Sequence, residues 1–252
     1  MKGGNFVNRL AILDDNLEFS RKLLNYLVDK NRKINILSLA ITGEEILEAV
    51  DKLTNDDILL LDLGLPTING IEVLQKLTQN KAHLPHIIIM SGNEKLLKQI
   101  KPYLPYIHEV MEKPFDFEKM LETIEKIIFN TEQKCYEILI KKELLKFEIN
   151  SHTKGYEYIV DAIQFVLYDK TLIKNLKTNL FELIASKYEG VTANNVKWTL
   201  EKSVTSVVRY TSSKVLREYF YIEAREKLAP KLFIGTIADN LRNEIEKEEV
   251  HY

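Results

Sequence analysis

The chain is poor in cysteine and has no long apolar segment. Its 252 residues include a single cysteine, Cys135, which excludes an intramolecular disulfide and any zinc site built on paired cysteines. No run approaches the roughly 18 apolar residues of a membrane helix, and the amino terminus lacks the apolar core of a signal peptide. We therefore expect a cytoplasmic protein with no membrane partner.

Neither sign of charge dominates the sequence. The chain has 35 lysines and arginines against 37 aspartates and glutamates, so the field of the whole protein favours no highly charged partner. Hydrophobic residues make up 45% of the chain, which suffices for the cores of two domains. The five histidines have neither metal-ligand spacing nor the context of a catalytic triad. An enzymatic output domain is therefore not expected.

Short apolar runs alternate with helical segments over residues 9–130. Runs of this kind are typical of buried parallel strands, and they occur at residues 10–13, 34–40, 58–61, 86–90 and 109–111. Between the second and third runs, Thr42 and Glu45 have the spacing of a capping box at the start of a helix. We expect residues 1–130 to form a doubly wound α/β domain.

Polar residues follow four of these runs, at the point where each predicted strand ends. They are Asp14 and Asp15, then Asp62, then Ser91, and finally Lys113 with Pro114. Because the carboxyl ends of neighbouring parallel strands meet in one crevice, three carboxylates, a hydroxyl and an ammonium are expected there. Three acids beside one lysine indicate a divalent-cation site with a phosphorylatable carboxylate.

These motifs, with the loop at residues 62–66 and Gly70, resemble the receiver domain of two-component response regulators over residues 8–128. The resemblance implies a flavodoxin-like fold in which Asp62 is the phosphoacceptor. It also implies a Mg²⁺ ion held by Asp15, Asp62 and the carbonyl of Gly64, and by Asp14 mostly through water. A carboxylate accepts a phosphoryl group poorly beside other negative charge, and the metal ion would neutralise that charge.

The resemblance assigns the remaining polar groups to the phosphorylated state. Lys113 supplies a point charge for a phosphoryl oxygen, and Ser91 a hydroxyl that turns toward the aspartyl phosphate. Pro114 shapes the loop that presents Lys113. Receivers usually have an aromatic switch residue three positions before the lysine, where this chain has Val110. The signal is therefore expected to pass through Ser91 and the loop after it, without the aromatic lever.

Residues 131–252 are predicted to form an all-α effector domain, joined to the first by a short or helical linker. Helices at 176–189 and 193–208 flank a turn at Glu189 and Gly190, with the spacing of a helix-turn-helix. Segments of this half resemble the effector domain of the stage-zero sporulation protein A family; they are residues 152–163, 184–188, 193–196 and 233–244. With the receiver, the resemblance covers nearly the whole chain.

The second resemblance implies sequence-specific DNA binding through the second helix of the pair. In the family that helix presents arginines at a spacing of three, but the matching positions here are Asn195, Trp198 and Glu201. Asn195 is a candidate reader of adenine, whereas Trp198 either contacts DNA or packs in the core. The full set of candidate DNA-binding residues is Asn194, Asn195, Lys197, Trp198 and Lys202.

The charge of the effector half keeps a second function open. Residues 131–252 hold 19 lysines and arginines and 18 aspartates and glutamates, a net charge of about +1. DNA-binding modules usually have a basic face, because phosphate neutralisation supplies most non-specific affinity. The alternative is a divergent sporulation-regulator paralogue with weak or no specific DNA binding, which acts by protein contact.

The double resemblance predicts a response regulator that controls transcription of the sporulation type. A histidine kinase or a phosphotransfer protein is the expected phosphoryl donor to Asp62, and DNA is the expected target of the effector domain. A homodimer formed on phosphorylation, RNA polymerase and another response regulator are the further partners that we consider.

Overall fold

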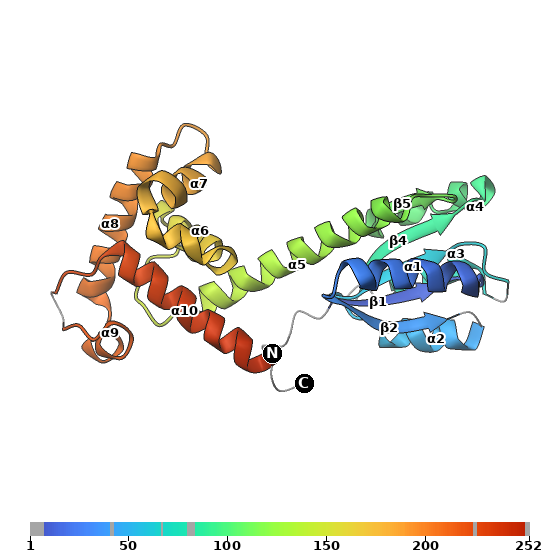
Figure 1. The fold of residues 1–252 in the computed structure, drawn as a ribbon, viewed down its shortest axis with the longest axis horizontal. Helices are drawn as coiled ribbons and strands as arrows, with labels where there is room; N and C mark the ends of the chain where they lie inside the picture. The colour runs from blue at the N-terminus through green and yellow to red at the C-terminus, as the bar shows by residue number, and fades with distance from the viewer. Residues whose placement is uncertain (1–7, 41–42, 67, 80–83, 224–225, 250–252) are drawn as a thin grey trace. The chain divides into compact units, whose positions relative to one another are not determined.

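The chain contains two compact units that divide between Glu132 and Gln133 (Figure 1). The computed structural model describes residues 8–40, 43–66, 68–79, 84–223 and 226–249. The helix α5 (Phe117–Leu144) runs without interruption across the division, so the linker between the units is helical. Thr42, the predicted helix cap, lies outside the described residues.

Five parallel strands form the sheet of the first unit, in the order β2-β1-β3-β4-β5. They are β1 (Asn8–Leu13), β2 (Ile34–Ala40), β3 (Ile58–Asp62), β4 (His86–Ser91) and β5 (Ile107–Glu112). The chain adds β2 on one side of β1 and then β3 on the other. This reversal of strand order makes the sheet doubly wound, as the sequence predicts, and opens a crevice beyond the carboxyl ends of β1 and β3.

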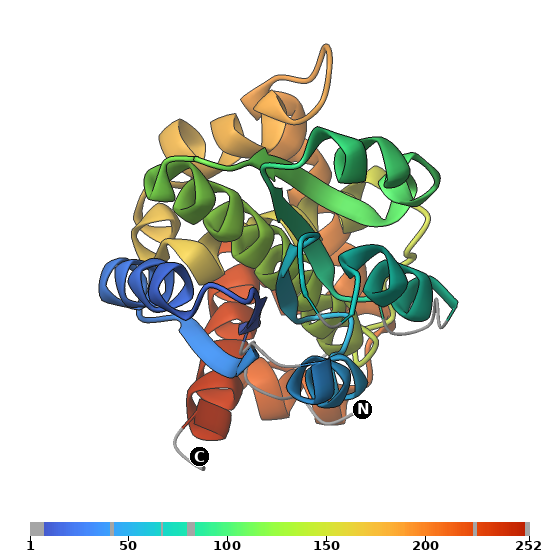
Figure 2. The same ribbon diagram turned by 90° about the vertical axis from the view of Figure 1, so that its right-hand side faces the viewer.

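Helices cover both faces of this sheet. The helices α1 (Leu17–Lys30) and α5 lie on one face, and α2 (Gly43–Lys52) and α3 (Gly70–Gln79) lie on the other (Figure 2). Successive residues of β1 belong alternately to the two apolar cores, one on each face of the sheet. Because both faces of the central strands β1, β3 and β4 are buried, these strands appear in the sequence as continuous apolar runs. Along the chain, β4 is followed by the short helix α4 (Glu94–Gln99) and the 3₁₀ helix η2 (Lys101–Tyr106), which lead to β5.

All the secondary-structure elements in the described part of the second unit are helices. Its elements are the end of α5, then α6 (Lys154–Tyr168), the 3₁₀ helix η3 (Lys170–Lys174), η4 (Leu176–Leu180), α7 (Phe181–Ser186), α8 (Ala193–Tyr210), α9 (Ser213–Phe220) and α10 (Pro230–Glu249). One apolar core joins them, and α6 packs against both α8 and α10. Ile140 and Leu144 of α5 belong to this core, which fixes the end of the long helix in the second unit.

The helix expected over residues 176–189 is shorter in the structure and irregular at its start. The segment begins with a π-helical turn at Leu176–Leu180, and α7 ends at Ser186. The turn that follows contains Gly190 at φ 70°, a backbone conformation that side-chain-bearing residues rarely adopt. The chain therefore leaves the helix before Gly190 and reaches α8 after a turn of six residues. The helix-turn-helix arrangement of α7 and α8 is retained.

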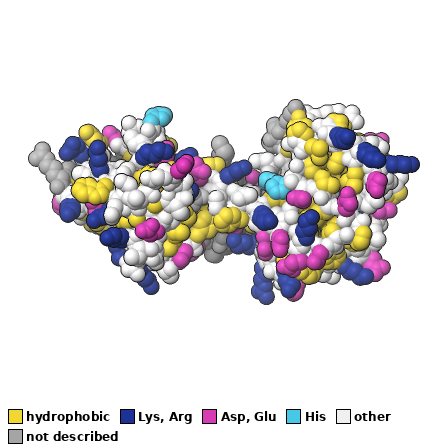
Figure 3. Space-filling view, turned by 90° about the horizontal axis from the view of Figure 1, so that it is seen from above, with side chains coloured by type: hydrophobic (Ala, Val, Ile, Leu, Met, Phe, Trp, Pro, Cys, Tyr) yellow, Lys and Arg dark blue, Asp and Glu magenta, His cyan; other side chains and the backbone are white. Residues whose placement is uncertain are grey.

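Two surface properties bear on the partners of this protein. On the face drawn in Figure 3, lysines and arginines are interspersed with aspartates and glutamates over both units. Among the described residues, no helix is long and apolar enough to cross a lipid bilayer.

Candidate functional site

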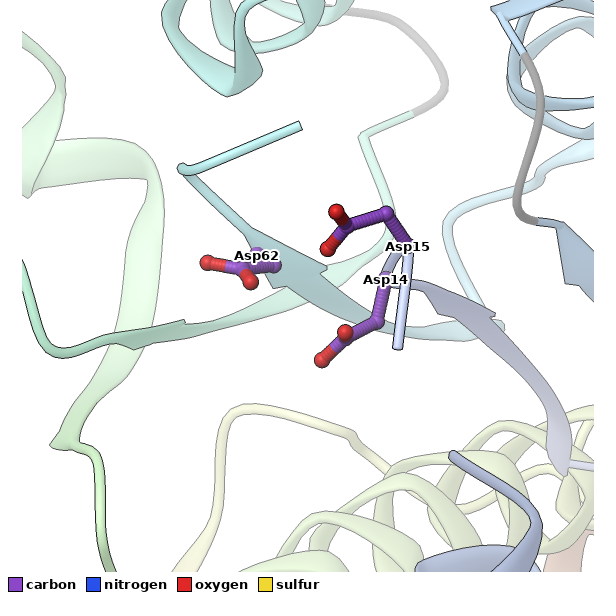
Figure 4. A group of neighbouring side chains, drawn as sticks. All are labelled: Asp14, Asp15 and Asp62. Atoms are coloured by element: carbon purple, nitrogen blue, oxygen red, sulfur yellow. The ribbon is translucent and has the colours of Figure 1, made fainter. Parts of the chain in front are cut away.

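Three carboxylates meet at the carboxyl ends of β1 and β3. Asp14 and Asp15 directly follow β1, and Asp62 is the last residue of β3 (Figure 4). One oxygen from each lies within 4.8 Å of the others, a spacing that allows one metal ion to contact all three. Asp14 is fully buried and Asp62 nearly so, whereas Asp15 is exposed. The sequence prediction that these residues converge is therefore correct for all three.

Lys113, one residue beyond β5, extends its ammonium group into the same crevice. Its Nζ atom lies 2.6 Å from Asp14 Oδ2 and 2.8 Å from Asp62 Oδ2. Burial by itself would lower the pKa of Lys113, but the hydrogen bonds to the two carboxylates outweigh it and raise the pKa. The lysine therefore remains charged and brings a fixed positive group next to Asp62.

Asp14 has the opposite balance of forces. Burial raises the pKa of Asp14 above its ordinary value, although hydrogen bonds from Lys113 and from the Asn16 backbone N–H act to lower it. A buried carboxylate whose charge is incompletely compensated favours an additional cation. Carboxylate oxygens are the ligands that Mg²⁺ prefers, so this donor set of Asp14, Asp15 and Asp62 fits a Mg²⁺ ion.

The loop after β3 holds Asp62 in place. The Gly64 N–H donates a hydrogen bond to Asp62 Oδ1 at 3.0 Å, and the Gly70 N–H donates to the Leu63 carbonyl at 3.3 Å. A Cβ atom on Gly70 would lie 2.6 Å from the Asp62 carbonyl oxygen, so only glycine fits at this approach. This contact is the structural reason for the glycine eight residues after Asp62.

Ser91, Val110 and Pro114 lie on β4 and β5 or just beyond their ends. Ser91 ends β4, is 1% exposed and accepts a hydrogen bond from the Asn93 N–H at 3.2 Å. The Lys113 N–H donates to the Ser91 carbonyl at 3.1 Å, which joins the ends of β4 and β5. The Lys113–Pro114 peptide bond is cis. Val110 is half-buried and packs against the apolar core on the α2 and α3 face of the sheet.

One residue near the site was not identified from the sequence. The ring of Phe19, in the first turn of α1, has its centroid 4.8 Å from Lys113 Nζ. The local sequence shows only an apolar residue in an amphipathic helix. The proximity of this ring to a lysine 94 positions later depends on how α1 packs against the segment after β5, which the sequence pattern does not specify.

In the second unit, the five candidate DNA-binding residues all lie on α8 and are exposed; they are Asn194, Asn195, Lys197, Trp198 and Lys202. Trp198 is 73% exposed, so of its two alternatives the one in which it packs in the core does not hold. It lies on the opposite side of the helix from the buried stripe formed by Val196, Leu200 and Val204. Helical periodicity identifies the buried stripe in the sequence, and it places Trp198 on the opposite, outer face of the helix.

Two of these side chains have partners within α8 or its cap. The Asn195 amide oxygen accepts hydrogen bonds from the Thr192 backbone N–H at 3.0 Å and from the Thr192 hydroxyl at 2.6 Å. Thr192 in turn accepts the Asn195 N–H, which completes a capping box. Lys197 Nζ lies 3.9 Å from the Glu201 carboxylate one turn later. Reading adenine with Asn195 would thus compete with its capping role, and its DNA-binding role stays a prediction.

The family comparisons agree with this geometry. A family model for the response regulator receiver domain matches residues 10–125, and the model described as "Sporulation initiation factor Spo0A C terminal" matches residues 140–241. The protein is therefore a two-component response regulator with a phosphorylatable receiver domain. It belongs to the sporulation-type family, in which the effector domain acts as a transcription factor. These matches favour transcription control over the alternative of a protein-contact regulator.

Solved structures of response regulators are among the structural matches, at low sequence identity. Full-length FixJ from B. japonicum is 18% identical, and the match covers 92% of this chain and 98% of that one, with a TM-score of 0.42. A receiver domain from Francisella is 19% identical over 49% of this chain and 98% of its own, with a TM-score of 0.42. A LuxR-family DNA-binding response regulator from Staphylococcus aureus has the same identity and TM-score over 48% of this chain and 98% of its own.

Proposed function

We propose that Asp62 is the phosphoacceptor and that a histidine kinase or phosphotransfer protein is its donor. The observation that carries this assignment is that an Asp62 oxygen lies within 4.8 Å of an oxygen of each of the other two carboxylates, while Asp62 Oδ2 lies 2.8 Å from Lys113 Nζ. Asp62 is the last residue of a central strand, and the N–H of Gly64 in the following loop holds its carboxylate. A nucleophile fixed in this way, beside a positive charge, meets the requirements of phosphoryl transfer.

In the transfer step, an Asp62 carboxylate oxygen attacks the phosphorus of a phosphohistidine. The new P–O bond to Asp62 forms as the P–N bond to the histidine breaks, and the histidine nitrogen keeps the electron pair. Bound Mg²⁺ held by Asp14, Asp15, Asp62 and the Gly64 carbonyl would supply the charge that neutralises the phosphoryl oxygens. Lys113 then exchanges its contact with the Asp62 carboxylate for one with a phosphoryl oxygen.

The product is sensed by Ser91. In the unphosphorylated protein its hydroxyl accepts the Asn93 N–H, and a turn toward the phosphoryl group releases that hydrogen bond at the start of α4. Val110 lacks the ring that serves as a lever in other receivers, so the loop from Ser91 to α4 carries the change. Pro114 keeps Lys113 directed into the crevice while this happens.

The effector domain binds DNA through the outer face of α8 in this proposal. Lys197 and Lys202 contact phosphates, Asn194 and Trp198 face the bases, and Asn195 holds the helix start through its capping box. Phosphorylation favours a homodimer, which would double the phosphate contacts of a domain whose net charge is only about +1. RNA polymerase and a second response regulator are the protein partners that a transcription factor of this type would meet.

The phosphorylation proposal is tested with acetyl phosphate and Mg²⁺ on the full chain. Wild type should gain one phosphoryl group, detected as a retarded band on a phosphate-affinity gel, and Asp62→Asn should gain none. Asp56→Asn is the matched control, because Asp56 is an exposed carboxylate just before the same strand. Retention of the modification in Asp62→Asn would show that another residue accepts the phosphoryl group.

The DNA-binding proposal needs a separate experiment. Phosphorylated protein should shift promoter DNA in a gel, with an affinity that falls as salt rises. Lys197→Ala and Lys202→Ala should each weaken binding, whereas Lys247→Ala, an exposed lysine near the end of α10, should not. Equal affinity in all three variants would place the DNA contact on another surface.

A further inference from the structure

The ammonium group of Lys113 has an aromatic neighbour in addition to its two carboxylates. Its hydrogen bonds to Asp14 and Asp62 use two of its three N–H groups. The Phe19 ring lies with its centroid 4.8 Å from the same nitrogen, well within the roughly 6 Å range of a cation–π contact. The Lys113 side chain is 22% exposed, so the contact is partly shielded from water. Such shielding strengthens an attraction between a cation and a ring face.

The Phe19 ring is itself held in a fixed place. The Phe19 N–H donates to the Asn16 side chain at 3.0 Å, which makes Phe19 part of the capped first turn of α1. Its ring makes edge contacts with Phe115 at 5.8 Å and with Phe117 at 5.7 Å between centroids. Phe115 follows Lys113 and Pro114 in the loop between β5 and α5, and Phe117 is the first residue of α5. The loop that presents the lysine therefore also fixes the ring beside it.

We propose that Phe19 is a positioning residue for phosphoryl transfer, which holds the Lys113 ammonium against Asp62 through a cation–π contact. The proposal rests on the assignment of Asp62 as phosphoacceptor. A lysine side chain has four rotatable bonds, and an ammonium at the mouth of a crevice is attracted to bulk water. The ring offers the ammonium a favourable surface on one side while the carboxylates bind it on the other. Phe19 thus reduces the motion that would carry Lys113 away from an incoming phosphoryl oxygen.

A purely steric role for Phe19 makes different predictions. A leucine at this position would still fill apolar space between α1 and the loop after Lys113, but it has no negative ring face for a cation. A tyrosine keeps both the shape and the ring face. The two substitutions therefore separate the cation–π contact from packing. Tyr26 provides the matched control, because it lies in the same helix and packs on the Phe117 ring at 5.7 Å between centroids.

Phosphorylation of the full chain by acetyl phosphate and Mg²⁺ measures the functional effect. We expect Phe19→Leu to lower the rate at saturating phosphodonor by roughly 3- to 30-fold, the range that such a contact supports. Phe19→Tyr and Tyr26→Leu should stay within about twofold of wild type. A rate for Phe19→Leu equal to wild type, or an equal loss in Phe19→Tyr, would overturn the proposal. If Phe19→Leu unfolds, fluorinated phenylalanines placed at residue 19 alone weaken the ring face at nearly constant shape, and the rate should fall with each added fluorine.

A spectroscopic measurement tests the contact without any phosphorylation. With lysine-labelled full-length protein, the Lys113 ε-methylene protons should be shifted upfield by the ring current of Phe19. The shift should persist in Phe19→Tyr and vanish in Phe19→Leu. An unshifted Lys113 in wild type would contradict the contact itself. A shifted Lys113 in wild type, together with full phosphorylation of the Asp62→Asn variant, would instead show that the phosphoacceptor assignment is wrong.

Discussion

A Cβ atom on Gly155 of α6 would lie 1.8 Å from the hydroxyl oxygen of Ser203 on α8 and 3.0 Å from the Ser203 Cβ. The two helices therefore cross at a point where only a hydrogen atom fits between the backbone of one and a side chain of the other. Because α8 has the exposed candidate DNA-binding residues, this crossing fixes the position of that helix on the core.

Gly155→Ala is expected to destabilise the protein by about 1–2 kcal/mol, since the hydroxyl of Ser203 can rotate away but its Cβ cannot. Ser203→Ala in the same chain should restore part of the loss. Gly235→Ala in α10 is the matched control, because its new methyl group would meet Ile173 at an ordinary 3.7 Å. That control should gain about 0.5–1 kcal/mol from helix propensity. Urea unfolding of the single and double variants measures each free energy, and a stabilised Gly155→Ala would contradict the close crossing.

Asp161 in α6 fixes the turn between α7 and α8. Its buried carboxylate accepts a hydrogen bond from the Tyr188 hydroxyl at 2.7 Å and forms an ion pair with Lys187. Asp161→Ala should lower the free energy of unfolding by about 1–3 kcal/mol, because it leaves two polar groups without their partner. Tyr188→Phe removes one hydrogen bond and should cost about 1 kcal/mol. Equal stability of Asp161→Ala and wild type in urea unfolding would show that the pair contributes nothing.

Asp14→Asn is expected to stabilise the protein when Mg²⁺ is absent. Burial raises the pKa of Asp14, so the stability that its native carboxyl provides below its ordinary pKa is lost as the pH rises through the raised value. Asparagine removes this loss, with an expected gain of about 0.5–2 kcal/mol at pH 7. Wild type should gain stability on addition of Mg²⁺, and the variant should gain little. Thermal unfolding with and without Mg²⁺ measures both effects; a variant that is less stable without the ion contradicts the reasoning.

Asn195→Ala should weaken DNA binding mainly by loosening the start of α8. Loss of its hydrogen bonds with Thr192 removes one half of the capping box, at an expected cost of about 0.5–2 kcal/mol in unfolding free energy. Asn194→Ala, an exposed neighbour, should leave stability unchanged and lower DNA affinity only if Asn194 contacts a base. Stability and affinity measured on both variants separate capping from recognition. An Asn195→Ala protein as stable as wild type would return Asn195 to the set of direct readers.

Gly70→Ala should slow phosphorylation without touching any reacting group. Its methyl group would lie 2.6 Å from the Asp62 carbonyl oxygen and 2.7 Å from the Leu63 Cα, so the loop after β3 has to shift. Misplacement of Asp62 is expected to slow transfer roughly ten- to a hundredfold. The rate with acetyl phosphate and Mg²⁺ is the measurement, with the fold checked by circular dichroism. A folded variant with the wild-type rate would show that the approach of Gly70 is dispensable.

The sequence predicted the receiver site well for a physical reason. Strands buried on both faces leave continuous apolar runs, and a parallel sheet brings their carboxyl ends together, so the convergence of Asp14, Asp62 and Lys113 follows from their positions in the chain. The effector half has no comparable rule. Helical periodicity located α8. It does not show which polar side chains on its surface already have partners, because those partners lie in helix caps and neighbouring elements.

The errors on α7 and α8 illustrate this limit. Trp198 was a candidate for the core because aromatic residues usually pack, yet the α8 core is filled by smaller side chains on the other face of the helix. Asn195 was considered as a reader of bases, although it closes a capping box with an asparagine in place of the usual glutamate or glutamine. The helix expected over 176–189 ends at Ser186, and periodicity does not reveal the π-helical turn at its start.

The sequence by itself determined that this protein has a doubly wound receiver with a carboxylate crevice. Its apolar runs predict buried parallel strands, and the polar residues after those runs mark the carboxyl ends of the strands. Only the tertiary structure decided the fine placement of side chains around that crevice and on α8. The contact of Phe19 with Lys113 and the crossing of Gly155 with Ser203 each join residues far apart in the chain. Such contacts depend on the packing of whole helices, which local sequence patterns do not encode.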